Sequence, residues 1–178
     1  KSLRFSPDLS GTEWKALGVP LASAVIKNST EEEISAPSVQ NVDNGIWFAR
    51  LKDNKTPEFV VDESAFGMAG LWAANGDTYT ISSEGAFEFK TLEEPAAPTE
   101  TGTFLMCSNP NTFTITLKQS AYILTTDGTS FEQEANPEIK PFQSFVLTDA
   151  KTLSTLRSLR IGDGVVTGNQ TIEPVDGY

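Results

Sequence analysis

Carboxylates are the side chains of this sequence with the clearest capacity for chemistry. They include a consecutive run and a looser group near a proline, namely Glu31, Glu32 and Glu33, and Glu132, Glu134 and Glu138. Two carboxyls could hydrolyse a glycoside if a protonated one faced an ionised one across a cleft. A calcium loop alternates its ligands, as in D-x-D-x-D-G, and that spacing is absent. Acidic runs are more typical of a solvated face, so a carboxylate-only hydrolase is a distant alternative.

Composition removes several other kinds of chemistry. The 178 residues include no histidine, and 13 Lys and Arg against 24 Asp and Glu give a net charge of −11. Histidine is the usual general base, the activator of Ser and Cys nucleophiles and a common zinc ligand. Nucleic-acid binding rests on cations that neutralise phosphates. We therefore expect no enzyme activity, no catalytic residue, no metal or cofactor and no nucleic-acid partner.

Aromatic residues could form a platform that stacks on sugar rings, because they combine a flat apolar body with a polar group. The candidates are Trp14, Trp47, Trp72, Tyr79, Tyr122 and Tyr178. Trp14 and Trp47 stand among apolar neighbours, which favours packing in the core. Trp72 stands beside a turn and is the best candidate for an exposed ring, although burial is still favoured for it.

Cys107, the single cysteine, cannot form an internal disulfide and lies in the apolar run GTFLMCS, so we expect a buried, unreactive thiol. The tripeptides at Asn28, Asn54 and Asn169 match the N-glycosylation acceptor, a pattern that arises often by chance. No apolar run is long enough for a membrane helix. Because the chain starts at Lys1 without Met, we expect that an export signal or anchor has been removed.

Period-two alternation indicates half-buried β-strands that would position these side chains. Inward residues are predicted at Tyr79 and Ile81, at Phe87 and Phe89, at Phe113, Ile115 and Leu117, and at Leu159 and Ile161. The runs at 45–51 and 121–126 are apolar on both faces and should be central strands or lie under an inter-domain contact. Asn, Asp and Gly recur between the runs, as tight hairpins require.

The fold class predicted from this pattern is all-β, a two-sheet antiparallel β-sandwich with short helical turns at most. Helical turns are expected at 29–33 and at 148–156, the latter capped by Thr148 or Asp149. Residues 1–178 should form a single domain. The Pro- and acid-rich segment 92–102 is predicted to be a loop, with a boundary between two small β subdomains as the alternative.

The segment NPEIKPFQSFVLTDA, residues 136–150, predicts a late strand between the sheets. Pro141 should fix the bend that leads into a strand at 142–147, because it has no amide hydrogen to donate to a ladder. Phe145 and Leu147 share one face of that strand and should be buried. Ser144 lies on the opposite face and should tolerate substitution.

This C-terminal region also resembles a known module. The segment AYILTTDGTSFEQEANPEIKPFQSFVL and the later SLRIGDG resemble the C-terminal β-sandwich module of Bacteroidetes cell-surface proteins of the leucine-rich-repeat surface antigen type. WKALGVPLA and GLWAANGDTYTISSEG look like earlier strands of that module. Lys140, Gln143 and Ser144 depart from its usual residues, and Leu21 follows Pro20 where the module has Phe.

The resemblance implies export, attachment to the cell surface and an adhesive or structural role without a catalytic residue. We therefore expect a non-catalytic, surface-exposed interaction or structural module whose partner is a protein or a glycan. A carbohydrate-binding module or glycan-capture component is the first alternative. A pilin-like adhesin subunit is a further alternative, since polymerising subunits leave an open groove or donate a terminal strand.

Overall fold

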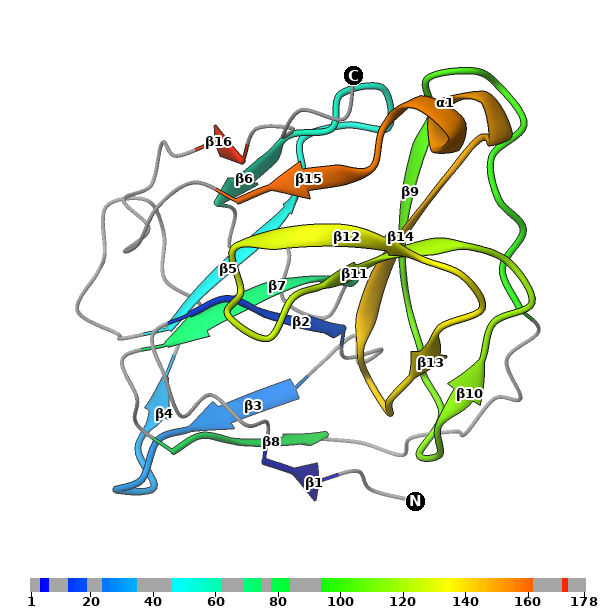
Figure 1. The fold of residues 1–178 in the computed structure, drawn as a ribbon. Coiled ribbons are helices and arrows are strands. Elements are labelled where there is room, and N and C mark those ends of the chain that lie inside the picture. Colours follow the sequence, from blue (N-terminus) through cyan, green and yellow to red (C-terminus); the bar gives the residue numbers. More distant parts are fainter. Residues whose placement is uncertain are drawn as a thin grey trace.

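The computed structural model describes residues 4–6, 13–18, 24–34, 46–61, 69–74, 78–83, 94–161 and 171–172. Within these ranges the chain is mostly β-strand with one short helix (Figure 1). The strands are β1 Arg4–Phe5, β2 Lys15–Gly18, β3 Ala24–Lys27, β4 Glu33–Ile34, β5 Ile46–Leu51, β6 Phe59–Val61, β7 Ala69–Ala74, β8 Thr80–Ser83, β9 Phe104–Ser108, β10 Ile115–Thr116, β11 Ala121–Leu124, β12 Ser130–Glu134, β13 Glu138–Ile139, β14 Ser144–Thr148, β15 Ser158–Arg160 and β16 Thr171–Ile172; the helix is α1, Ala150–Thr155. The all-β prediction is thus confirmed at the level of secondary structure.

The described strands form four sheets, all with antiparallel pairing, where the sequence predicted two. Two of the sheets have five strands, in the orders β15-β12-β11-β14-β9 and β16-β6-β5-β7-β2. A four-stranded sheet has the order β1-β8-β3-β4, and β10 pairs with β13. The expected central strands are confirmed, because β5 and β11 each lie in the middle of a five-stranded sheet.

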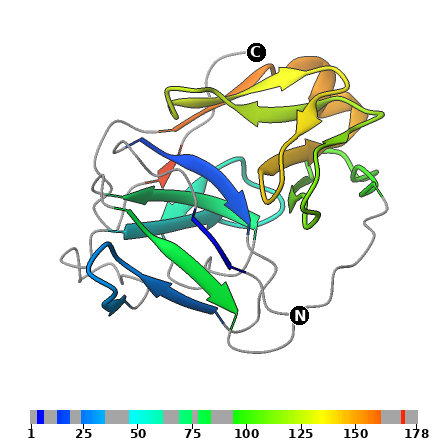
Figure 2. The ribbon, with the colours of Figure 1, turned by 90° about the horizontal axis from the view of Figure 1, so that it is seen from below.

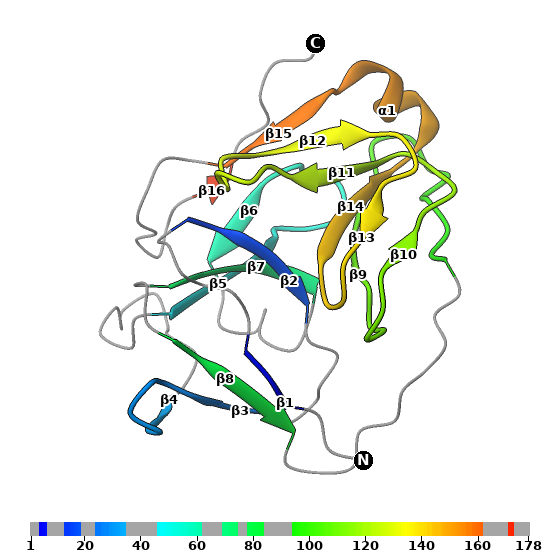
Figure 3. The ribbon, with the colours of Figure 1, turned by 60° about the horizontal axis from the view of Figure 1, so that its bottom comes forward.

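Between the two five-stranded sheets lies a shared apolar core. Figures 2 and 3 show the sheet of β9, β11, β12, β14 and β15 lying over the sheet of β2, β5, β6 and β7. The buried residues of this core are Trp14, Ala16, Ala49, Phe59, Phe104, Tyr122, Phe131, Val146, Leu156, Leu159 and Ile161. The rings of Phe59 and Phe131 stack across it, with centroids 5.3 Å apart and planes 4° from parallel. Burial of such apolar area supplies most of the driving force that holds the sheets together.

The C-terminal five-stranded sheet carries a second core on its other face. There Phe145 and Leu147 of β14 pack with Leu117, Ala121 and Ile139. The short pair β10 and β13 contributes the last of these residues and covers this face (Figure 3). β14 is therefore buried on both faces along its whole length.

Burial on both faces corrects one prediction. Phe145 and Leu147 are fully buried as expected, but Ser144, predicted to lie on a tolerant opposite face, is also 0 % exposed. The strand begins at Ser144, after a turn in which the Gln143 amide donates to the Lys140 carbonyl at 3.1 Å. Phe142 lies in that turn with φ of 60°, so the bend is set by Phe142 as well as by Pro141.

Alternation predicts burial well in two other strands. Tyr79 and Ile81 are buried, as are Leu159 and Ile161. In the run at 112–117 the prediction fails for Phe113, whose side chain is 58 % exposed. Strand β10 is only two residues long, so the pleat does not extend back to Phe113. Phe87 and Phe89 lie outside the described residues.

The two predicted helical turns have different outcomes. α1 is confirmed, with Asp149 as its N-cap, because the Thr152 amide donates to the Asp149 carboxylate. Residues 29–33 instead make a tight turn that joins β3 to β4. The Asn28 side-chain oxygen accepts from the amides of Thr30 and Glu32, both at 3.0 Å, and this competes with helix formation.

Residues 94–103, here called the strap, contain the described part of the predicted Pro-rich loop. No strand or helix forms in it. At one end the Gln119 side-chain amide donates to the Pro95 carbonyl at 2.7 Å, and the Lys118 amide donates to the Glu94 carboxylate. At the other end the Gly102 amide donates to the Asp149 carboxylate at 2.8 Å. The strap is thus fastened at one end to the residues that precede β11 and at the other end to the N-cap of α1.

Candidate functional site

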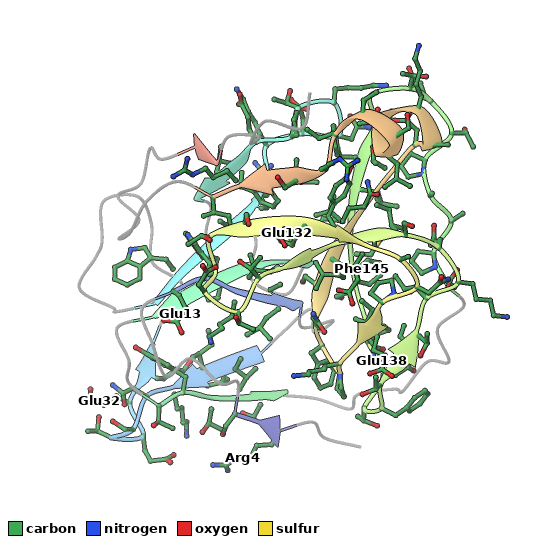
Figure 4. The ribbon with its side chains drawn as sticks, viewed as in Figure 1. Arg4, Glu13, Glu32, Glu132, Glu138 and Phe145 are labelled. Carbon is green, nitrogen blue, oxygen red and sulfur yellow. The ribbon has the colours of Figure 1, made fainter. Side chains whose placement is uncertain are left out.

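The candidate glutamates are spread over three parts of the fold, the β3–β4 turn, β12 and β13. Glu31, Glu32 and Glu33 are exposed where β3 turns into β4. Glu132 and Glu134 are exposed on β12, and Glu138 is exposed on β13. Figure 4 shows Glu132 and Glu138 well separated, with Glu32 at the far end of the molecule. Within the described residues no group of His, Cys, Asp or Glu side chains could hold a metal ion.

The described aromatic candidates do not form an exposed platform. Trp14, Tyr79 and Tyr122 have exposed fractions of 6 %, 1 % and 0 %. Trp47 is partly buried against the shared core, and its indole nitrogen is buried without a hydrogen-bond partner. The side chain of Trp72 and all of Tyr178 lie outside the described part of the chain.

Cys107 is half-buried and unsuited to nucleophilic chemistry. It packs against the second core of the C-terminal sheet. Burial raises the pKa of its thiol to about 11, so little thiolate forms near neutral pH.

Two of the three glycosylation-type asparagines fall in described turns. Asn28 holds the β3–β4 turn through its own side chain, as above. Asn54 is exposed in the loop after β5. Asn169 lies outside the described residues.

Buried polar side chains in the C-terminal half hold loops in place. The side-chain amide of Asn109 donates to the carbonyls of Phe113, Ile139 and Lys140 at 2.9–3.2 Å, and its oxygen accepts from the Asn111 amide. The Tyr122 hydroxyl donates to the Leu156 carbonyl at 2.5 Å. These groups have partners within the protein, and their role is structural.

Among the described residues, a shallow groove of about 200 Å³ lies beside β9. Its walls come from the end of β5, the loop that follows and the first half of β9, with the lining residues Arg50, Leu51, Asp53, Asn54, Phe104, Leu105 and Met106. Leu105 is 41 % exposed, and with Phe113 it makes up the exposed large hydrophobic residues of the described chain. The groove is therefore mainly apolar, with two charged residues in its wall.

β9 is the last strand of its sheet, and one side of its backbone faces the groove. β14 pairs with its other side, from Phe104 opposite Thr148 to Ser108 opposite Ser144. The Phe104 amide points away from β14, since it donates to the Asn54 carbonyl at 2.7 Å. Backbone groups of successive residues alternate in direction, so those of Met106 and Ser108 also point outward. No described residue forms a hydrogen bond with them on that side.

Charges in the groove wall are held by backbone contacts. The Arg50 guanidinium donates to the Leu51 and Lys52 carbonyls at 2.8 and 3.1 Å. The Asp53 carboxylate accepts from the amides of Lys55 and Thr56 at 2.8 and 2.7 Å. The hydrogen bond from Lys55 is the largest cause that lowers the pKa of Asp53, so this carboxylate stays ionised at neutral pH.

Sequence reasoning missed this groove. In the sequence, GTFLMCS is an apolar run around Cys107, and its pattern does not by itself indicate a position at a sheet edge. The available signal was the absence of Lys, Glu or Pro within the strand, since these residues usually protect an edge. That signal has meaning only when the sheet order is known.

Comparison of the chain with known protein families, with curated proteins and with solved structures finds no match in any of the three. In the described ranges no helix has the length and apolar character needed to cross a membrane. The candidate site therefore rests on the geometry of the groove and of the β9 edge.

Proposed function

We propose that this chain is a non-catalytic interaction or structural module of a bacterial cell-surface protein, with its two five-stranded sheets as the layers of a β-sandwich. The core shared by these sheets supports the layered arrangement, because sandwiches bury the inner faces of two sheets against each other. The resemblance of the C-terminal region to surface modules supports the location.

The observation that carries the interaction role is the open edge of β9 beside an apolar groove. Unpaired backbone groups next to apolar side chains can hold another polypeptide. They supply no nucleophile and no acid–base pair. The pilin-like adhesin alternative draws on the same open edge, since fibre subunits bind each other by adding a strand.

A glycan array tests the proposal against its enzymatic and carbohydrate-binding alternatives. We expect the purified chain to be retained by no glycan and to release no sugar from any of them. Selective retention would favour a carbohydrate-binding module, with Phe113→Ala as the first variant to compare because its ring is 58 % exposed. Release of sugar would refute the non-catalytic role.

Surface location has its own test. Intact cells of a bacterium that encodes the chain are treated with a protease, and the chain is followed with an antibody. We expect the signal to disappear from intact cells while a cytoplasmic marker is retained. Survival of the signal alongside that marker would refute exposure at the surface.

A further inference from the structure

We propose that the outer edge of β9 binds one extended, basic segment of a partner protein by strand addition. This inference rests on the proposed interaction role and specifies its surface and the chemistry of its partner. It is carried by the backbone of β9, the shape of the groove and the charge of the chain.

The backbone of β9 offers a short ladder to an incoming strand. Met106 and Ser108 each direct an amide and a carbonyl away from β14, and no described residue satisfies them. At the first residue of the strand the Asn54 carbonyl already accepts the Phe104 amide. An added strand therefore begins beyond Phe104 and pairs with Met106 and Ser108.

Side chains beside this ladder suit apolar residues of a bound segment. Leu105 is 41 % exposed and lines the groove together with Leu51 of β5. Added strands gain affinity from main-chain hydrogen bonds and specificity from contacts of alternate side chains. A small β-branched residue of the bound segment, on the same face of the sheet as Leu105, would cover its exposed surface.

The net negative charge of the chain favours a basic segment as the occupant of the groove. Lys52 and Lys55, which flank Asp53, are paired with Glu58 at 3.4 Å and Glu100 at 2.8 Å. Among the described residues no cation lies within ion-pair distance of Asp53, which lines the groove, although Lys52 attracts its carboxylate from farther away and Arg50 lines the same groove. A lysine or arginine of the bound segment could supply one, and the net charge of −11 would attract it over longer range.

The same charge disfavours a second copy of the chain as the occupant. Two copies would each carry −11 into the contact. The loop bearing Asp53 and Asn54 also forms one wall of the groove, which leaves room for a single strand more readily than for another folded sheet. A partner segment without fixed tertiary structure meets neither obstacle.

The test uses a labelled synthetic peptide of alternating valine and lysine, with both ends blocked, and measures binding to the full chain by fluorescence anisotropy. We expect saturable binding that weakens as salt is added, because salt screens exposed charges. The same peptide with N-methyl groups on alternate amides should bind at least about tenfold more weakly, since it cannot complete the ladder. A peptide of alternating valine and glutamate should not bind.

Variants of the chain locate the site. Met106→Pro removes one outward amide and should weaken binding about tenfold, and proline is tolerated where an edge amide faces solvent. Leu105→Ser should weaken binding, whereas Phe113→Ser, a matched change at the other exposed apolar residue, should not. Asp53→Asn retains an oxygen for the Lys55 and Thr56 amides and should weaken binding about two- to fivefold. Melting temperatures establish that each variant is folded.

Several results would overturn the inference. The N-methylated peptide or the acidic peptide could bind as tightly as the valine–lysine peptide. Leu105→Ser and Phe113→Ser could also weaken peptide binding to the same extent. Dimerisation that is detected by sedimentation and abolished by Met106→Pro would assign the edge to a second copy instead. A chain that binds no peptide and no glycan refutes strand addition only, whereas glycan capture or turnover on the array refutes the proposed function itself.

Discussion

Replacing Asp149 with asparagine tests whether a buried charge fastens both α1 and the strap. Asp149 is 2 % exposed. One carboxylate oxygen accepts from the Gly102 amide at 2.8 Å and from the Thr152 hydroxyl at 2.7 Å, and the other accepts from the Thr152 amide at 2.9 Å. The same side chain thus caps the helix and holds the end of the strap.

Asparagine has nearly the same shape but only one acceptor oxygen. In either orientation its NH₂ group would face an amide donor, that of Thr152 or that of Gly102, whereas the Thr152 hydroxyl can turn and accept from it. No hydrogen bond to a charged acceptor remains, and in each orientation one amide loses its acceptor on residue 149, with the Gly102 amide keeping only the Thr152 hydroxyl oxygen at 3.2 Å. We expect the free energy of unfolding to fall by about 2–4 kcal/mol, a large part of the roughly 5–15 kcal/mol typical of a domain.

The pH dependence of this effect follows from the pKa of Asp149. Burial opposes its ionisation, but the hydrogen bonds from Thr152 and Gly102 outweigh burial and hold the pKa well below the usual 3.8. In the unfolded chain the value returns to the usual one. The pKa of Asp149 is lower in the folded chain than in the unfolded chain. Its contribution to stability is therefore complete above the unfolded-state pKa and is lost as pH falls through the folded-state pKa. The difference between the two proteins should be constant from about pH 5 to 8 and shrink below about pH 4.

Guanidinium unfolding followed by tryptophan fluorescence measures this difference across pH. Asp127→Asn is the matched control, since Asp127 accepts from Thr125 and Thr129 in a similar way but is exposed. We expect a smaller loss in the control. A loss below about 0.5 kcal/mol in Asp149→Asn, or a difference that does not change in acid, would refute the buried-charge argument.

Further predictions concern two glycine positions in the backbone, one core phenylalanine and the cysteine thiol. Gly128 has φ of +70° and an added Cβ would lie 2.6 Å from the Trp14 carbonyl oxygen, whereas Gly102 has φ of +79° and open space. Gly128→Ala should therefore lower the melting temperature more than Gly102→Ala, and equal losses would argue against the steric cause. Phe145→Ala should cost about 3–5 kcal/mol in chemical denaturation, and a loss under 1 kcal/mol would argue against full burial. Because the pKa of Cys107 is raised to about 11, iodoacetamide should modify it at pH 8 only after unfolding; rapid modification of the folded chain would argue against its burial.

Sequence periodicity predicted burial where one face of a strand meets solvent. Tyr79 and Ile81 of the β8 region are buried while Thr78 is exposed, because a half-solvated antiparallel strand needs this alternation. A cap at Thr148 or Asp149 was also predicted, and Asp149 takes the role, since an acceptor side chain before a short polar helix satisfies free amides locally. Both features depend on residues close together in sequence.

Predictions failed where long-range packing decides burial. Ser144 is buried because residues of the other five-stranded sheet cover one face of β14 while Leu117 and Ile139 cover the other. The sequence of β14 itself does not indicate that residues from elsewhere in the chain bury its second face. Phe113 is exposed because the strand pair β10 and β13 starts only at Ile115. The β9 edge was missed for the same reason, since the order of strands in a sheet is a property of the whole chain.

The open edge of β9 is partly explained by the demands of folding. Met106 packs against the shared core and Cys107 against the second core, so a protective charge at either position would have to be buried. Leu105 differs, because it is 41 % exposed and a lysine there could extend into solvent, as in many protected edges. Folding therefore accounts for apolar residues at 106 and 107 but does not require one at 105. The leucine at that position adds apolar surface to the groove, which is the property that strand addition would use.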